Sequence, residues 1–166
     1  IHLLPVFDIA TIPETDQQTP VITAPGEPTP APNSPAPQAA IGKVRLHDGF
    51  NWGYDPLHYG VPEGSYSTNP EGITRIREFR EMVQTLEKMN LGVVMDVVYN
   101  HTHAAGEDPQ SILDKIVPGY YYRLDTEGKV QHTSCCPDTA SEHAMMEHLM
   151  IQTLVRWAKA YHVRGF

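Results

Sequence analysis

Basic residues are scarce in this sequence. Twelve Lys and Arg stand against 20 Asp and Glu, and the net charge is −8. Binding to phosphate backbones needs clustered Lys and Arg, so this charge argues against nucleic acid as a partner. Long hydrophobic runs are also missing, since no apolar stretch approaches the roughly 20 residues that span a bilayer. We therefore expect neither a nucleic acid nor a membrane as a partner.

Several motifs of common enzyme sites are absent as well. There is no GxGxxG or GxxxxGK[ST] loop that would cradle a phosphate, no GxSxG nucleophile elbow and no CxxC pair. A methionine start is also missing, and both ends of the chain have the pattern of strands rather than of tails. We expect a fragment of a larger protein, in which a signal peptide would not be visible.

Cysteine is limited to one adjacent pair, Cys135 and Cys136. Consecutive Cα atoms lie about 3.8 Å apart, below the usual disulfide span of about 4.4 to 6.8 Å. This geometry favours two free thiols. The alternative is a strained bridge between neighbours, which would favour an oxidising compartment. The localisation we favour is secreted or periplasmic.

Two stretches have no helical period. Residues 13–39 carry prolines at positions 13, 20, 25, 28, 30, 32, 35 and 37 among Thr, Ala, Ser and Gln. Such a composition cannot bury a core, so we expect a proline-rich, exposed insertion. Residues 47–69 are rich in aromatics as well as in Gly and Pro, which predicts an irregular loop of the kind used for binding.

The most informative stretch is Leu91-Gly-Val-Val-Met-Asp-Val-Val-Tyr-Asn-His101. Its valine-rich run predicts a strand buried on both faces, as in parallel sheets. Asp96 interrupts the run and is costly there unless a site uses it. Residues 2–7 predict a first buried strand ending at Asp8, and residues 163–166 predict the start of another.

Two amphipathic helices are expected between these strands. One follows Asn69 as its cap and Pro70 as its first residue, and it stops at Asn90. The other opens with a capping box at Thr139-Ala-Ser-Glu142 and runs to about Tyr161. The long loop between His101 and Asp138 carries tyrosines, so we expect it to be ordered.

The resulting order is strand, loop, helix, strand, loop, helix, strand. Its strands should be parallel, and both long loops should lie at the carboxyl ends of the strands. That arrangement fits a (β/α)8 barrel or an open doubly wound sheet. In either case Asp8, the aromatic loop, the Asn100–His101 pair and the tyrosine loop should converge on one side.

The converging groups suit a sugar ring. Trp52, Tyr54 and Tyr59 offer flat apolar faces, and the nearby carboxylates, Asn100 and His101 offer hydrogen bonds. A zinc site at His101-Thr-His103 would need further ligands from other strands, so we assign no metal.

At this point the residues resemble a family. Asp96-Val-Val-Tyr-Asn-His101 resembles the Asp-x-x-x-Asn-His region of the α-amylase superfamily, glycoside hydrolase family 13, at the end of the third barrel strand. Asn51-Trp-Gly-Tyr-Asp-Pro56 resembles the signature of type I pullulanases and limit dextrinases, with Phe50 in place of the first Tyr. Cys135-Cys-Pro-Asp-Thr-Ala-Ser-Glu142 is similar to the cysteine-bearing loop of that branch, and Val163-Arg-Gly-Phe166 also agrees with it.

The resemblance implies a fold and a function. Residues 1–166 would be a fragment of a catalytic (β/α)8 TIM barrel, from about its second strand to the start of its fourth, with the 13–39 insertion inside it. The parent enzyme would be a debranching glycosidase that cleaves α-1,6-glucosidic linkages in pullulan, starch or glycogen limit dextrins with retention. Its partner would be an α-glucan.

The resemblance also implies residue roles. Tyr54 would stack on the glucose before the scissile bond, His101 would hydrogen-bond its hydroxyls, and Asp96 would support them. Asp55, Asn100 and Trp52 would brace the loops. Asn100 ligates calcium in many amylases, so calcium is a candidate cofactor of the full-length protein only.

No catalytic carboxylate is among these residues. A retaining glycosidase needs two carboxyls about 5 Å apart. In the family the nucleophilic Asp follows Gly-Phe by two residues, and the acid/base Glu and a third Asp come later. We expect the fragment to be inactive alone. Two alternatives stay open: a superfamily enzyme acting on α-1,4 or trehalose-type bonds, and a non-catalytic carbohydrate-binding module.

Overall fold

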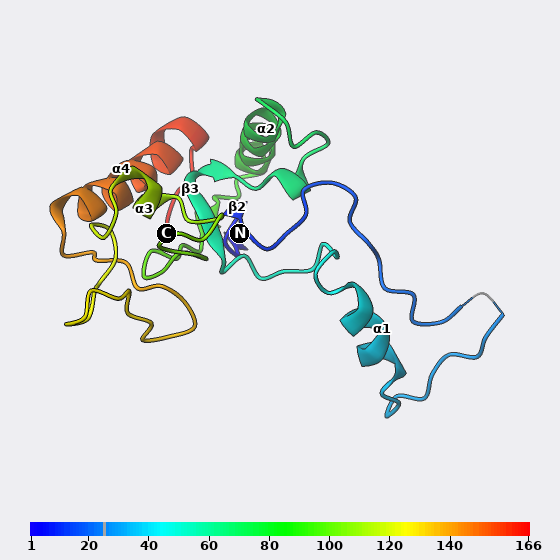
Figure 1. The fold of residues 1–166 in the computed structure, drawn as a ribbon. Coiled ribbons are helices and arrows are strands. Elements are labelled where there is room, and N and C mark those ends of the chain that lie inside the picture. The colour runs from blue at the N-terminus through cyan, green and yellow to red at the C-terminus, as the bar shows by residue number, and fades with distance from the viewer. Residues whose placement is uncertain (25) are drawn as a thin grey trace.

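The protein has a mixed α/β fold. The computed structural model describes residues 1–24 and 26–166, so Pro25 of the proline-rich stretch lies outside the described residues. Helices and strands alternate along the chain, and two small sheets form the centre between the helices (Figure 1). Among the described residues, no helix is long and apolar enough to cross a membrane.

Three parallel segments meet at β4 (Val94–Met95). β1 (His2–Leu3) pairs with it in parallel, and Gly165 forms a parallel bridge to Val94 on its other side. The amide of Met95 donates to the carbonyl oxygen of Gly165 at 2.9 Å, and the amide of Asp96 donates to Leu3 at 2.9 Å. The first and last residues therefore both lie next to β4, and the N- and C-termini lie near the centre of the molecule in Figure 1. The parallel pairing expected from the sequence is present.

The strand expected over residues 91–101 is much shorter than predicted. Only Val94 and Met95 form a strand, and they are not buried on both faces, because Val94 is 36% exposed while Met95 is fully buried. Only one face of β4 is covered by the apolar core of the described residues. The valine run alone could not reveal this, since a one-sided strand and a two-sided strand both tolerate valine.

A second sheet was not predicted. β2 (Phe7–Ile9) pairs antiparallel with β3 (Pro56–Pro62), with Phe7 opposite Pro62 and Ile9 opposite Pro56. The prediction of an irregular loop over residues 47–69 is therefore wrong for β3. It is also wrong for the short 3₁₀ helix η1 (Gly64–Tyr66) that follows. The two prolines stand at the strand ends, where a missing backbone donor is tolerated.

The first expected strand is split in the same way. Pro5 separates β1 from β2, so residues 2–7 belong to two different sheets. A proline removes a ladder hydrogen bond, which is why a single central strand cannot continue through this position.

The first of the two predicted helices, α2 (Thr74–Lys88), starts later than predicted. Ile73 is its cap, and the Asn69 side chain instead accepts a hydrogen bond from the Glu71 amide in a turn. Its expected end is correct, because Asn90 adopts a left-handed conformation with φ of 60° just beyond it.

The second helix, α4 (Ala144–Tyr161), has no side-chain cap at its N-terminus. The predicted capping box is wrong because its members are engaged elsewhere. The Thr139 hydroxyl donates to the carbonyl oxygen of Tyr99, and Glu142 pairs with Arg123. Tertiary contacts thus compete successfully with a local cap that is worth only about 1 kcal/mol.

The apolar core joins the helices to both sheets. One cluster contains Phe7, Met95, Val98, Trp157, Tyr161 and Val163, and a second contains Tyr59, Leu113, Tyr122 and Met146. The indole of Trp157 donates to the carbonyl oxygen of Tyr59 at 2.8 Å, which fixes α4 against β3. Tyr59 of the aromatic stretch is therefore part of the core, whereas Phe50, Trp52 and Tyr66 are exposed.

The loop after His101 is ordered, as expected. It contains the short helix α3 (Leu113–Ile116), and a bridge from His101 to Asp138 brings its two ends together, while Tyr122 bridges to Thr139. Tyr122 is only 1% exposed.

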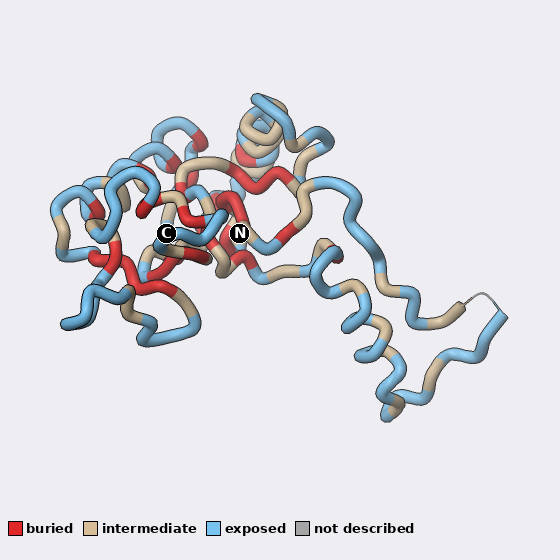
Figure 2. The backbone as a smooth tube through the Cα atoms, viewed as in Figure 1, coloured by how far each residue is buried: buried red, intermediate tan, exposed pale blue. Residues whose placement is uncertain are grey.

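The proline-rich stretch extends away from this core (Figure 1). None of the described residues between 13 and 39 is buried, as Figure 2 shows. Its last residues begin the helix α1 (Ala36–Val44), which has no buried residue either. This helix did not figure in the sequence prediction.

Candidate functional site

A direct hydrogen bond links the two sequence motifs. The Tyr54 hydroxyl, from the loop before β3, donates to Oδ2 of Asp96, just after β4, at 2.5 Å. This bond is the main reason why the pKa of Tyr54 is raised, with burial and the negative charge of Asp96 adding to it. The phenol therefore stays protonated and continues to donate.

Gly53 makes this placement of Tyr54 possible. Its φ of +81° is a conformation that favours glycine, and a Cβ there would lie 2.3 Å from the carbonyl oxygen of Pro5. The loop thus passes directly against the backbone between β1 and β2. The sequence contained this signal as the glycine before Tyr54, but only the structure shows what it contacts.

His101 is held on both its side chain and its backbone. Its Nε2 lies 2.8 Å from the carbonyl oxygen of Tyr54, and its own carbonyl accepts a hydrogen bond from the Tyr59 hydroxyl at 2.7 Å. Because a carbonyl only accepts, Nε2 carries the ring proton and Nδ1 presents a lone pair. Nδ1 is buried and has no hydrogen-bond partner among the described residues.

Tyr59 supports this site rather than facing a ligand. The expectation that it offers a free flat face is wrong, because the side chain is 6% exposed and packs against Phe7 and Tyr99 with ring centroids 6.0 and 4.8 Å away. Burial raises the pKa of Tyr59 well above its ordinary value, so its hydroxyl remains a donor to His101. Trp52, in contrast, is 65% exposed.

The supporting residues lie around this link. Asp55 accepts from the Thr11 hydroxyl at 3.0 Å, and its other oxygen lies 3.6 Å from Nδ1 of His103. The backbone carbonyl of Asn100 accepts from the Thr139 amide at 3.1 Å, while its side chain is exposed. His103 thus contacts Asp55, and the described residues do not combine it with His101 in a metal-binding cluster.

Asp8 does not join the site as the sequence predicted. Its carboxylate contacts Arg75 at 3.2 Å and Nδ1 of His58 at 2.5 Å. Asp8 sits in β2, whose antiparallel pairing directs it toward α2 rather than toward the end of β4. Glu14 and Glu63 lie beside it, and Arg75 supplies the positive charge that offsets this acidic cluster.

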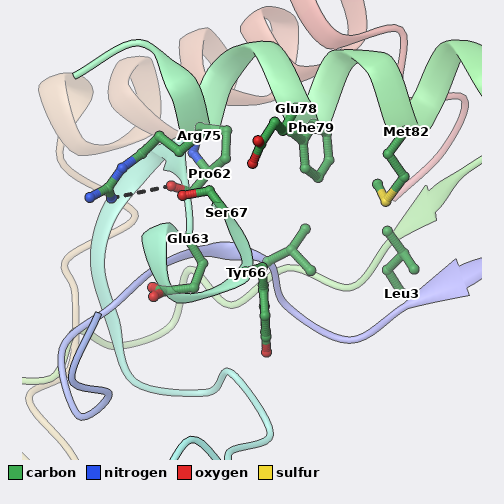
Figure 3. A pocket seen from close by; sticks show the side chains of 10 residues that line it. Leu3, Pro62, Glu63, Tyr66, Ser67, Arg75, Glu78, Phe79 and Met82 are labelled. Atoms are coloured by element: carbon green, nitrogen blue, oxygen red, sulfur yellow. Dashed lines mark hydrogen bonds between the residues drawn. The ribbon is translucent and has the colours of Figure 1, made fainter. Parts of the chain in front are cut away.

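A cavity of about 200 Å³ lies next to this acidic cluster (Figure 3). Arg75 and Glu63 stand at one end, Leu3 and Met82 at the other, and Glu78 and Phe79 lie between them. None of Trp52, Tyr54, Asp96 and His101 lines it, so we do not regard it as the functional site.

Cys135 and Cys136 are joined by a disulfide, and the expectation of two free thiols is wrong. Their Cα atoms are 3.8 Å apart, the ordinary spacing of neighbours, so a bridge forms without the usual span. The pair lies beside the site, because both sulfur atoms and a ring nitrogen of His101 are within 4.8 Å of one another.

The structure therefore brings Tyr54, Asp96 and His101 together, with the disulfide at their edge. The arrangement offers an aromatic face, a carboxylate and a buried imidazole with an unused lone pair. It includes no pair of carboxylates set up for glycoside hydrolysis among the residues that form it.

Comparisons with known proteins agree with the motifs. No protein-family model matches the chain. It is 44% identical to pullulanase 1 of Arabidopsis thaliana over all of this chain and 17% of that protein. It is 52% identical to a pullulanase of Klebsiella pneumoniae over 81% of this chain and 13% of that protein.

Solved structures agree as well. The crystal structure of Klebsiella pneumoniae pullulanase complexed with maltotriose has a TM-score of 0.88 and 41% identity, over 100% of this chain and 19% of that one. The chain thus spans less than a fifth of the length of these relatives. With this identity along its whole length and two linked motifs at its site, the chain belongs to the pullulanase family.

Proposed function

We propose that the protein is a debranching glycoside hydrolase that cleaves α-1,6-glucosidic linkages in pullulan, starch or glycogen limit dextrins with retention. The hydrogen bond from Tyr54 to Asp96 carries this proposal, because it unites the pullulanase-like loop with the strand-end motif at 2.5 Å. The maltotriose complex of a 41% identical relative supports an α-glucan as the substrate.

Tyr54, Asp96 and His101 form the sugar-binding wall in this proposal. The Tyr54 ring stacks on a glucose, and its hydroxyl is held by Asp96, so the ring cannot rotate away. His101 hydrogen-bonds the hydroxyls of that sugar, as the family resemblance implies. Trp52, Asp55 and Asn100 support the loops around them.

The segment forms one part of a (β/α)8 barrel in this proposal. Three parallel segments, with α2 and α4 between them in sequence, support such an arrangement. Residues 13–39 are an exposed insertion within the barrel domain, consistent with the lack of buried side chains there. The missing nucleophile and acid/base would come from further strands, so residues 1–166 alone should not hydrolyse pullulan.

The test is a pullulan hydrolysis assay on the full-length protein and its variants. Tyr54→Ala should lower kcat/KM by about 100-fold, because stacking in the site is lost. Tyr54→Phe keeps the ring and loses only the bond to Asp96, so it should lower kcat/KM by about tenfold or less. Tyr66→Ala is the matched control, since Tyr66 is 59% exposed near the same loop and should have little effect.

The same assay separates the alternatives. Faster hydrolysis of an α-1,4-linked glucan than of pullulan would identify a different superfamily activity. Binding of maltotriose by the full-length protein without any turnover would indicate a carbohydrate-binding module. Equal losses for Tyr54→Ala and Tyr66→Ala would contradict the role assigned to Tyr54.

A further inference from the structure

The strongest unassigned cluster lies at the edge of the candidate site. It consists of Cys135, Cys136 and His101, whose possible ligand atoms lie within 4.8 Å of one another. Two cysteines and one histidine are a known ligand set for zinc, with the fourth tetrahedral position left to water. In the oxidised form the sulfurs are bonded to each other and cannot act as thiolate ligands.

The hydrogen bonding of His101 matches that of a metal-bound histidine. Metal-bound histidines usually donate their second ring N–H to a carboxylate or a backbone carbonyl, which orients the ring and fixes the tautomer. Nε2 of His101 makes this contact with the carbonyl oxygen of Tyr54 at 2.8 Å. The other nitrogen, Nδ1, is buried, carries the lone pair and has no hydrogen-bond partner in the described part of the chain.

We propose that reduction of the Cys135–Cys136 disulfide creates a Zn²⁺ site formed by the two thiolates and Nδ1 of His101. In a tetrahedral zinc site, ligand atoms lie about 3.5 to 3.8 Å apart. After reduction the two sulfurs move apart to this spacing by rotation of the freed cysteine side chains, and each has to approach the ring nitrogen of His101 by no more than about 1.3 Å. Zinc binding at these atoms does not depend on the proposed glucan activity.

A dithiol supplies the two electrons that reduce the Cys135–Cys136 disulfide. One thiolate of the dithiol attacks a disulfide sulfur, and its second thiol then displaces the cysteine. The dithiol leaves as a disulfide after giving two electrons, and its two protons pass to Cys135 and Cys136. Zn²⁺ then displaces both thiol protons when it binds.

The surroundings allow access to the pair. Cys135 is exposed and Cys136 half-buried, so a dithiol can reach the bond. A cavity of about 320 Å³ adjoins Cys135 and is lined also by His103, Asp108 and His132. This space admits a hydrated cation and leaves room for water at the fourth position.

The test compares Zn²⁺ binding by the oxidised and the reduced full-length protein, by calorimetry or by competition with a chromophoric chelator. The reduced sample is prepared with a phosphine that is removed before titration, because dithiols themselves bind zinc. The reduced protein should bind about one Zn²⁺ at least about 100-fold more tightly than the oxidised protein. The double variant Cys135→Ser and Cys136→Ser should bind as weakly as the oxidised protein in both states.

Co²⁺ reports on the ligands directly. The reduced protein should show thiolate-to-cobalt charge transfer and the visible bands of a tetrahedral site. His101→Gln should weaken binding by about tenfold or more and alter the visible bands while keeping the charge transfer. His148→Gln, an exposed histidine on α4, is the matched control and should change neither.

Two results would overturn the proposal. One is binding by the reduced protein that is no tighter than that of the double serine variant. The other is an unchanged affinity and cobalt spectrum in His101→Gln. Circular dichroism of each variant shows whether the fold is retained, and the oxidised wild-type protein provides a folded form that lacks the thiolates without any substitution.

Discussion

Two stretches of this chain look alike in composition and differ completely in structure. Residues 13–39 and residues 47–69 are both rich in turn-forming residues and lack a helical period. The first has no buried residue among those described, whereas the second contributes Pro56, Tyr59 and Pro62 to the interior. The difference arises from pairing with the core: residues 56–62 form β3 against β2, and Tyr59 packs against Phe7 and Tyr99, whereas the described residues of the first stretch form no strand.

The largest difference between the two stretches is expected when a glycine in each, both with a positive φ, is replaced by alanine. Gly53 and Gly26 have φ values of +81° and +88°, but only at Gly53 would a Cβ meet another backbone atom, 2.3 Å away. Gly53→Ala should therefore destabilise the protein by about 2 to 5 kcal/mol and abolish the bond from Tyr54 to Asp96. Gly26→Ala should cost about 1 kcal/mol or less.

Denaturant unfolding of both variants measures these costs. Equal destabilisation would mean that the positive φ alone sets the cost of each substitution. The packing of residue 53 against Pro5 would then contribute nothing to stability.

A smaller effect is expected when single hydroxyl groups are removed. Tyr59→Phe leaves the buried carbonyl of His101 without its partner and should cost about 1 to 3 kcal/mol. Tyr66→Phe removes an exposed hydroxyl that lies 3.4 Å from Asn51, and its effect should stay within about 0.5 kcal/mol. Thermal unfolding of the two variants, each with the same atom deleted, gives the contrast directly.

Alkaline pH should weaken the buried aromatic region and leave the proline-rich stretch unaffected. Burial raises the pKa of Tyr122, which packs in the same cluster as Tyr59, from 10.0 to about 12. A raised pKa stabilises the fold fully below pH 10, and this contribution is lost as the pH rises toward 12. The loss should reach about 1.4 kcal/mol by about pH 11.

Unfolding midpoints at two pH values, together with tyrosinate absorbance, check this expectation. The control is Tyr122→Phe, in which the decline between the two pH values should be smaller. A decline of the same size in that variant would assign the alkaline sensitivity to other groups.

The smallest effect is expected from shortening the proline-rich stretch. The amide of Gln18 donates to the carbonyl of His47 at 2.7 Å, so the chain on either side of residues 19–46 already lies together. Replacing residues 20–44 with a short Gly-Ser linker should change stability by less than about 1 kcal/mol, because loop closure depends only weakly on length. A large loss in calorimetry would show that α1 has a structural role that its exposure conceals.

The sequence by itself determined the family, the exposure of the proline-rich stretch and the two residues, Asp96 and Tyr54, that a hydrogen bond joins at the candidate site. These signals are local motifs and compositions, which need no knowledge of distant contacts. It also indicated parallel strands joined through helices, because the alternation of apolar runs with helical periods can be recognised in the sequence alone.

Only the tertiary structure decided the rest. The β2–β3 sheet, the diversion of Asp8 to Arg75 and the use of Tyr59 as a support for His101 all depend on pairings across about 40 to 70 residues of sequence. The same reason explains why Thr139 and Glu142 do not cap α4, because Thr139 bonds to Tyr99 and Glu142 pairs with Arg123. A local interaction such as a helix cap, which contributes about 1 kcal/mol, does not form when contacts with residues distant in sequence stabilise another conformation by more.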